Sequence, residues 1–338
     1  VKREALENLR RASPLAGESP VYVEGLIAFY EERFDDALGK AREAFDAAEW
    51  LYEARKLEGD IRVETGTRRA LRGEHEAALQ DFDHAGVAYR QAAEIARSAA
   101  PVYEGDCERW ARVMDTLVRM GTSGDAAFSE AAAACGHALE VDPDRARTHE
   151  ILAFLHGRRA DHLLDAGRDA RGALDQAVVS ARRAVALDPT SATAHHALGS
   201  VLTVGGMAEL TAGIDPRPQL EEAIAAFERA VALRPRFVLA HDDLGYAYER
   251  LARHEMNTGR DPRPALARAI ASFERAITLG PGYANAHNNL GIALWRRAVA
   301  SHRLDEDPIP DLDRAVESCE TAISLNPAYA YARANLGL

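Results

Sequence analysis

The stretch AIASFERAITLGP (residues 269–281), followed by AHNNLG (residues 286–291), decides the fold of this chain. Its closing proline is one of a series that recurs every 46 residues: Pro143, Pro189, Pro235, Pro281 and Pro327. Each proline ends a similar phrase, as in AVALDP, AVALRP and AISLNP. Self-similarity at a fixed period of this length indicates a repeat architecture, in which each unit buries its apolar face on its neighbours.

Small residues recur in the same register and indicate two antiparallel helices in each unit. Around Pro235, for example, Ala223 and Ala230 precede the proline and Gly245 follows it, and the other repeats match. Small residues at a helix crossing let the axes approach closely, while large residues such as Phe227 and Phe273 fill the layer beside them. Because proline cannot continue a helix, it separates one unit from the next. We predict an all-α, right-handed α-solenoid of antiparallel helix pairs.

AHNNLG and AIASFERAITLGP resemble the two helices of the tetratricopeptide repeat (TPR) almost residue for residue. A TPR repeats every ~34 residues, so each unit here has about twelve more, between its first and second helix. GIDPRP (213–218) and GRDPRP (259–264) read as a turn and a helix start, with aspartate as cap and proline in the first turn. We predict an elongated hairpin, in which about seven added residues lengthen the first helix by roughly 10 Å.

The N-terminal part carries the motif less regularly. Residues 18–47, 48–98 and 101–143 each fit one helix pair, and the second pair has a long first helix that begins near Trp50. We therefore expect irregular TPR-like units over residues 1–143 and regular 46-residue units over 144–338, the last one truncated, in one continuous solenoid with six full units. The missing initiator methionine and signal sequence predict a segment of a larger protein.

Composition limits the partners and the compartment. The chain has 41 Lys and Arg and 53 Asp and Glu, which gives a net charge of -12. A field of this sign would repel the phosphate backbone of a nucleic acid. No apolar run approaches the ~18 residues of a membrane span, so we expect neither nucleic acid nor direct membrane insertion. The three cysteines are too scattered for a disulfide framework or a CxxC site, and Cys135 and Cys319 read as free, small hydrophobes in the crossing layer. We predict a reducing, cytoplasmic location, with the periplasmic side of an envelope protein as the alternative.

Motifs of catalysis are missing from the sequence. The sequence lacks the phosphate-binding, dinucleotide-binding, hydrolase and metal motifs GxxxxGK[ST], GxGxxG, GxSxG, HExxH and CxxC. His149-Glu150 begins like the zinc-protease motif HExxH, but Ala153 occupies the position of its second histidine. A histidine series recurs with the repeat: His149, His195, His241 and His287. Equivalent residues on neighbouring helices lie about 9–10 Å apart, too far to share a metal with bonds of ~2.1 Å. We assign these histidines to packing, with pH sensing or ligation as the alternative, and predict no catalytic residue, metal or cofactor.

The first helices of a TPR solenoid line its concave surface, so groove residues recur at fixed positions. If the third residue after each proline is position one, positions two, five, six, nine, twelve and thirteen should face inward. They predict a groove for a peptide or protein partner, formed by Arg147, Glu150, His196, Asp242, Asp243, Tyr246, Glu249, Arg250, Asn285, Asn288, Asn289, Trp295, Arg296 and Asn335. Asparagine amides could pair with an extended backbone, and the two aromatic residues could anchor the partner. The alternative is that asparagine is simply common here and the groove is empty.

Two stretches near the N-terminus resemble the TPR region that follows the kinase domain in some large bacterial serine/threonine protein kinases. They are SPVYVEGLIAFYEERFDDALGKAREAF (19–45) and WLYEARKLEGDI (50–61). The resemblance implies a docking or sensory module attached to a kinase. HRD, DFG and glycine-rich-loop motifs are absent, so this segment would not transfer phosphate itself. We expect a protein–protein interaction scaffold in bacterial signalling. The alternative is an envelope-associated structural or assembly TPR protein with no enzymatic parent.

Overall fold

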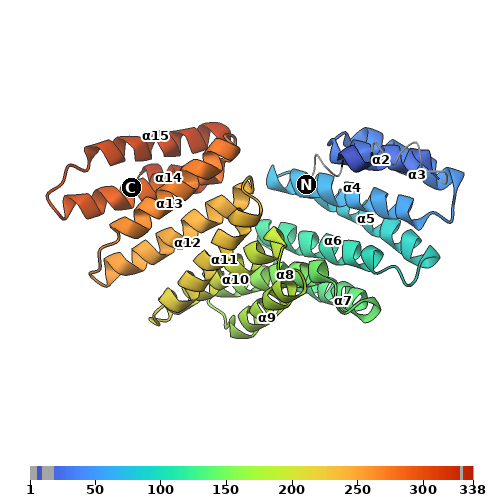
Figure 1. Cartoon of the computed structure of the whole chain (residues 1–338), viewed down its shortest axis with the longest axis horizontal. Helices are drawn as coiled ribbons and strands as arrows, with labels where there is room; N and C mark the ends of the chain where they lie inside the picture. Colours follow the sequence, from blue (N-terminus) through green and yellow to red (C-terminus); the bar gives the residue numbers. More distant parts are fainter. Residues whose placement is uncertain (1–5, 10–18, 328–329, 338) are drawn as a thin grey trace. The chain divides into compact units, whose positions relative to one another are not determined.

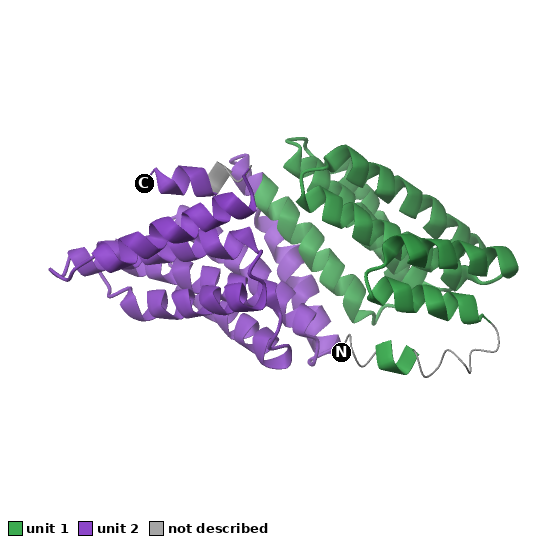
Figure 2. Cartoon of the chain, turned by 90° about the horizontal axis from the view of Figure 1, so that it is seen from above, with its two compact units in different colours: residues 1–162 green, residues 163–338 purple. Residues whose placement is uncertain are grey.

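The computed structural model describes residues 6–9, 19–327 and 330–337. Its chain divides into two compact units, residues 1–162 and 163–338 (Figure 2). The first unit contains α2 (Pro20–Tyr30), α3 (Phe34–Ala47), α4 (Tyr52–Leu71), α5 (His75–Ile95), α6 (Ala100–Arg119), α7 (Asp125–Val141) and most of α8 (Ala146–Asp165). The second contains α9 (Arg171–Leu187), α10 (Ala192–Thr211), α11 (Arg217–Leu233), α12 (Val238–Asn257), α13 (Arg263–Leu279), α14 (Ala284–His302), α15 (Ile309–Leu325) and α16 (Ala330–Leu336).

Consecutive helices pack as pairs, as the repeat pattern predicts. In the first unit α2 packs on α3, α4 on α5 and α6 on α7, and in the second α10 packs on α11, α12 on α13 and α14 on α15 (Figure 1). Six such pairs pack within the two units of the described chain, and α8 and α9 lie at the boundary between the units.

The residues in excess of the TPR motif lengthen the first helices, which confirms the elongated hairpin. Helices α10 and α12 have 20 residues each, against 17 in α11 and α13. Gly213 and Gly259 end the first helices with φ of 74° and 73°, in the left-handed region that favours glycine. Asp215 and Asp261 then accept hydrogen bonds, each 3.1 Å long, from the backbone N–H two residues later, so aspartate caps the second helix as predicted.

Glycine is required where the two helices of a pair cross. A Cβ atom added to Gly245 would lie 2.7 Å from the ring of Phe273, and one added to Gly199 would lie 2.8 Å from Phe227. Both phenylalanines are fully buried. The glycine and phenylalanine that recur in the sequence are thus in direct contact, with the aromatic ring of the second helix against the backbone of the first. This contact determines how closely the two helices of a pair approach each other.

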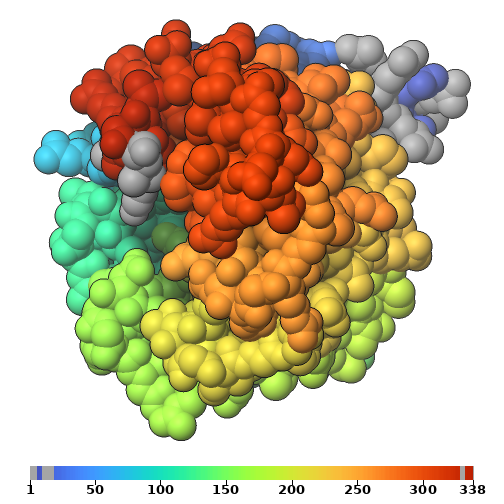
Figure 3. All heavy atoms as spheres, turned by 90° about the vertical axis from the view of Figure 1, so that its left-hand side faces the viewer, coloured from blue at the N-terminus to red at the C-terminus, as the bar shows by residue number. Residues whose placement is uncertain are grey.

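First helices also contact one another across repeats. In the second unit α10 touches α12, α12 touches α14 and α14 touches α16, whereas within its described residues no such contact joins α11 to α13 or α13 to α15. Figure 3 looks onto the edge of this unit, where the yellow, orange and red segments of successive repeats follow one another. Because the first helices approach more closely than the second ones, they form the inner side of this unit. We call this side of α10, α12, α14 and α16 the first-helix face.

The cysteines correct one prediction. Cys107 of α6 and Cys135 of α7 form a disulfide that joins the two helices of one pair, and both residues are fully buried. Cys135 is therefore not a free cysteine, and the argument for a reducing compartment loses its basis because disulfides persist mainly in oxidising environments. The sequence hid this bond because the two cysteines are 28 positions apart and meet only when the residues between them fold into a hairpin. Cys319 is free and buried, as predicted.

Candidate functional site

Polar side chains on the first-helix face connect neighbouring repeats with a constant offset of 47 residues. Position five of one repeat pairs with position six of the next: His196 Nε2 lies 2.7 Å from Asp243 Oδ2, and Asn289 Nδ2 donates to Asp242 Oδ1 over 3.2 Å. Asn335 continues the series by donating from Nδ2 to Asn288 Oδ1 over 2.8 Å. The structure therefore brings these predicted groove residues together as a ladder between helices, which occupies part of their hydrogen-bonding capacity.

Asp242 is the most strongly perturbed group of this ladder. It is only 4% exposed, and it lies next to the carboxylate of Asp243. Burial, and then the charge of Asp243, raise the pKa of Asp242 to about 7, although hydrogen bonds from Asn289 and Tyr283 act in the opposite direction. Near neutral pH, the carboxyl group of Asp242 is therefore present in both its protonated and its ionised form.

A second connection joins positions twelve and thirteen. Glu249 of α12 is 2% exposed and accepts a hydrogen bond from Arg296 Nε of α14, while Arg250 Nε lies 3.1 Å from its other carboxylate oxygen. Arg250 also covers the ring of Tyr246, 4.3 Å from its centroid, and Arg296 lies 5.7 Å from the ring centroid of Trp295. Two guanidinium groups thus share one buried carboxylate, and each of them lies over a half-buried aromatic ring.

An apolar pocket opens beside these arginines. It has a volume of about 240 Å³, and we call it the α15 pocket. Its apolar wall comes from α14 and α15, and its polar rim comes from α12, α14 and α16. The lining residues are Arg250, Gly291, Ile292, Trp295, Arg296, Leu312, Ala315, Val316, Cys319, Asn335 and Leu336.

The predicted groove residues differ in exposure. Asp242, Glu249 and Asn288 are buried between first helices, Asn285 is exposed, and the remaining groove residues of the second unit are half-buried. In the first unit, exposed Arg147 pairs with Glu108 of α6 at 2.9 Å and with buried Glu150 at 2.9 Å. A role of these residues in partner binding stays a prediction.

The histidine series has a specific structural contact. In each of the four repeats, Nε2 of the histidine lies 3.0–3.3 Å from the backbone oxygen of the proline six residues earlier, as His287 does from Pro281 at 3.0 Å. The side chain therefore binds the turn that starts its own helix. Among the residues that the structure describes, no three His, Cys, Asp or Glu side chains come together as a metal site.

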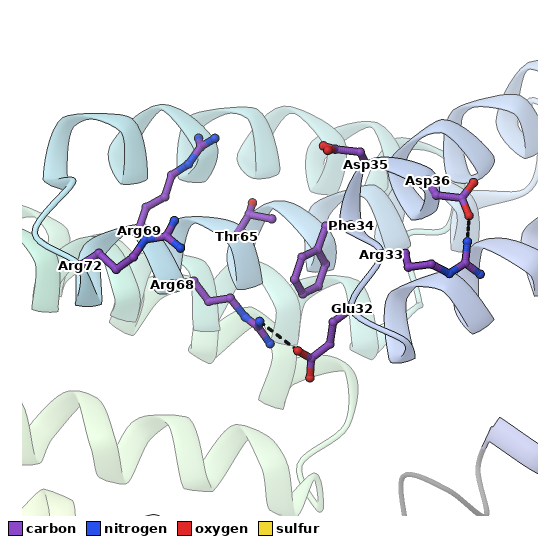
Figure 4. A pocket seen from close by; sticks show the side chains of 9 residues that line it. All are labelled: Glu32, Arg33, Phe34, Asp35, Asp36, Thr65, Arg68, Arg69 and Arg72. Carbon is purple, nitrogen blue, oxygen red and sulfur yellow. Dashed lines mark hydrogen bonds and ion pairs between the residues drawn. The ribbon is translucent and has the colours of Figure 1, made fainter. Parts of the chain in front are cut away.

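A larger pocket of about 610 Å³ lies in the first unit, around the turn between α2 and α3 and the end of α4 (Figure 4). Four arginines line it, but carboxylates neutralise them: Arg68 pairs with Glu32 at 3.1 Å, and Arg69 turns away to Asp81 at 2.7 Å. Such a solvated set of ion pairs offers little net charge to a ligand. We therefore regard the first-helix face as the better candidate site.

Sequence reasoning missed several residues of this site. Tyr283 hydrogen-bonds Asp242 and accepts a hydrogen bond from Asn285, although it precedes the first helix. The wall of the α15 pocket was missed as well, because most of its residues lie on α15, a second helix outside the predicted groove positions.

The helix pairs, the glycine crossings and the adjoining first helices define a TPR-type α-solenoid. The chain belongs to the family described as Regulator of microtubule dynamics protein 1-3, whose model matches residues 76–259, more than half of the chain. No curated protein sequence matches significantly. Among the described helices, none is both long enough and apolar enough to cross a bilayer.

Several solved structures are similar to this chain. The chain is similar to the Cut9–Hcn1 hetero-tetramer of the APC/C, with 15% identity and a TM-score of 0.51 over 99% of this chain and 58% of that one. It is also similar to a tetratricopeptide repeat protein from Parabacteroides merdae, with 12% identity, 94% and 96% coverage and a TM-score of 0.48. YrrB, a TPR protein with an unusual peptide-binding site, has 19% identity, 74% and 98% coverage and a TM-score of 0.38.

Proposed function

We propose that the chain is an interaction scaffold and that the first-helix face of the second unit binds a protein or peptide partner. The observation that carries this proposal is the pair of arginine–aromatic contacts on adjacent helices, Arg250 with Tyr246 and Arg296 with Trp295. Aromatic residues and arginine dominate the energetic centres of protein interfaces, because they bury a large area and keep directional donors. Here they lie half-buried beside an apolar pocket, which is the arrangement that a partner can cover.

The ladder defines what such a partner would contact. Asn289 and Asn335 each donate to the preceding first helix, so they support the face as cross-links more than as a free clamp. Asn285 is exposed at the start of α14, beside Tyr283, where a partner backbone can reach it. We therefore propose that aromatic and arginine side chains provide most of the affinity and that the asparagines fix the spacing between helices.

Two larger settings fit this scaffold. The resemblance of residues 19–61 to TPR regions behind kinase domains supports a docking module of a bacterial signalling kinase, and the family description supports a regulatory protein. A kinase parent would carry HRD and DFG motifs outside Val1–Leu338. An envelope protein would carry a membrane or lipid anchor there instead. The sequence of the parent gene therefore distinguishes these settings.

Partner capture tests the scaffold itself. Tyr246→Ala/Trp295→Ala removes both aromatic rings and leaves Asn289 in place, because its amide supports buried Asp242. Trp50→Ala is the matched control, since Trp50 is a 61% exposed tryptophan of the other unit. We expect the double variant to lose at least ~90% of the partners that the wild type and the control retain, since aromatic anchors cost about 2 kcal/mol or more each. Equal capture by all three proteins, at equal melting temperature, would refute the proposed site.

A further inference from the structure

The lengthened first helices continue the first-helix face beyond the positions that were predicted to form the groove. Residues three, four and seven positions apart share one side of a helix, so positions sixteen and twenty continue the stripe of positions nine and thirteen. The structure confirms this for position sixteen, because Met207 Sδ of α10 accepts a hydrogen bond over 3.4 Å from the hydroxyl of Tyr246 of α12. We call positions fourteen to twenty of the three helices the distal segment. It consists of residues 205–211, 251–257 and 297–303.

Two arginines of the distal segment are exposed and have no ion pair. Arg253 is at position sixteen of α12, and Arg303 is at position twenty of α14, where it forms the C-cap. Within the described part of the chain, neither guanidinium group is paired with a carboxylate. Arg297 of the same segment differs, because it pairs with Asp311 of α15 at 2.5 Å. The donors of Arg253 and Arg303 are therefore open to a ligand.

The exposure of these side chains on α12 belongs to the repeat itself. Helix α12 contacts α10 on one side and α14 on the other, and the structure describes both neighbours from their first to their last residue. Between these neighbours Arg250 keeps 15% of its side chain exposed, and Arg253 is more exposed still.

The inward positions at this end of the face carry a net positive charge. Positions nine, twelve, thirteen, sixteen and twenty of α10, α12 and α14 contain four arginines and one carboxylate: Arg250, Arg253, Arg296, Arg303 and Glu249. Nearby carboxylates are bound to the second helices. Glu209 accepts a hydrogen bond from Gln219 of α11 over 2.9 Å, and Glu306 pairs with Arg263 of α13 at 3.2 Å. The distal segment is thus a basic surface on an acidic chain.

The acidic groups of the first-helix face lie at some distance from this surface. Asp243 precedes Arg253 by ten residues on α12, which corresponds to roughly 15 Å at 1.5 Å per residue, and it pairs with His196. That separation exceeds the Debye length of about 8 Å at physiological ionic strength, so the two charges are largely screened from each other. An anionic group can therefore approach Arg253 without strong repulsion from Asp242 and Asp243.

We propose that the distal segment binds the carboxylates of an acidic peptide segment of the partner. This inference rests on the proposed function, because it names the chemistry of the partner that the first-helix face would bind. A guanidinium group presents a fork of donors that fits a carboxylate, and Arg250 and Arg296 place such groups beside the aromatic rings of the face. Four arginines suit a short acidic segment, whereas a polynucleotide would extend over the remainder of a chain with net charge -12.

A pair of short peptides tests the charge preference without a known partner. The probe is acetyl-EEFEE-amide, and its uncharged counterpart is acetyl-QQFQQ-amide. In an NMR titration we expect the acidic peptide to shift the methyl resonances of Met207 and Val299, which are half-buried in the distal segment. The uncharged peptide should bind at least about fivefold more weakly at low salt, and an ionic strength of about 0.5 M should remove most of that difference. Equal affinity of the two peptides at low salt would overturn the proposal.

Arg253→Gln/Arg303→Gln removes the two unpaired charges. We expect at least about a fivefold loss of affinity for the acidic peptide at an unchanged melting temperature, because both side chains are exposed. Arg268→Gln/Arg275→Gln is the matched control, since it removes two exposed arginines of α13 and changes the net charge equally. If the double variant melts lower than the wild type, Arg253→Gln alone gives the test, because Arg253 lies away from the helix end. Unchanged affinity in the folded variant would contradict the distal segment.

Charge reversal distinguishes a specific site from a general field. Arg253→Glu/Arg303→Glu should bind acetyl-KKFKK-amide more tightly than acetyl-EEFEE-amide, whereas Arg268→Glu/Arg275→Glu should keep the preference of the wild type. The same change of preference in both variants would show that net charge, and not the distal segment, selects the peptide. Tighter binding of a thymidine oligonucleotide than of the acidic peptide to the wild type would overturn the peptide as ligand.

Partner capture separates this inference from the proposed function. Once probe binding is measured, loss of the partner in both Tyr246→Ala/Trp295→Ala and Arg253→Gln/Arg303→Gln supports both claims. Loss in the aromatic variant alone overturns the distal segment and leaves the face as the binding site. Loss in the arginine variant alone supports the distal segment and overturns the aromatic anchors. Retention in both variants overturns the two claims together.

Discussion

Asn335 donates from Nδ2 to Oδ1 of Asn288, 2.8 Å away and 47 residues earlier in the chain. The same offset joins His196 to Asp243, and Asp242 to Asn289. Since the repeat has 46 residues, position five of one first helix consistently meets position six of the next. Polar residues that look like free groove contacts in the sequence are therefore first of all the connections between repeats.

Asp242→Asn should change stability in a pH-dependent way. The pKa of Asp242 is about 7 in the fold, above the unfolded value of about 3.9, so the folded state binds the proton more tightly. That contribution to stability is fully present below the unfolded pKa and is lost as the pH rises through 7. Asparagine resembles the protonated acid and is the natural residue at equivalent position 288. We expect the stability of the variant relative to the wild type to increase by about 2–3 kcal/mol between pH 5 and pH 8.

Urea unfolding at the two pH values measures this difference. Asp313→Asn is the control, because Asp313 is an exposed aspartate of α15 in the same unit. The same stability gain at both pH values would show that Asp242 does not bind a proton near neutrality.

Gly245→Ala should destabilise the second unit by about 1–3 kcal/mol, because the new methyl group overpacks a filled core. Its Cβ would lie 2.7 Å from the buried ring of Phe273, so the α12–α13 pair would have to separate. Gly172→Ala is the matched control, since a Cβ there meets nothing within 4 Å and alanine favours helix α9. Thermal melts that rank the two variants in the opposite order would contradict the proposed crossing.

His287→Ala should lower stability by roughly 1 kcal/mol, the contribution of one hydrogen bond. Its Nε2 lies 3.0 Å from the oxygen of Pro281, so the change removes a contact that holds the turn before α14. His302→Ala is the control, because His302 is exposed at the end of the same helix. Zinc added to the wild type checks the alternative function. A zinc-dependent rise in melting temperature that disappears in His287→Ala would mean ligation in place of turn binding.

Reduction should weaken the first unit. The Cys107–Cys135 bond closes a loop with a sequence separation of 28, for which restriction of the unfolded chain predicts about 3–4 kcal/mol. Urea unfolding with and without reductant measures this loss, and Cys107→Ser should show no response to reductant. Thiol titration of the unfolded, unreduced chain should find one thiol, that of Cys319. Three reactive thiols would mean that the bond does not form.

The sequence was sufficient for the helix pairs and for their local details. Pro235 and its equivalents separate the units, Gly245 marks a crossing, and Asp215 caps the lengthened hairpin, because each depends on residues close together in the chain. The cross-repeat contacts were not predictable in the same way. They depend on the rotation of each first helix relative to the next, which determines that Asp242 meets Asn289. The disulfide depended likewise on how α6 crosses α7.

Hydrogen exchange with a captured partner is the most direct test of the binding face. If the partner binds the first-helix face, amides of α12 and α14 should gain protection on binding, and those of α11 and α13 should exchange as in the free chain. Protection confined to the second helices, or to the first unit, would contradict the central claim that Tyr246, Arg250, Trp295 and Arg296 form the partner site.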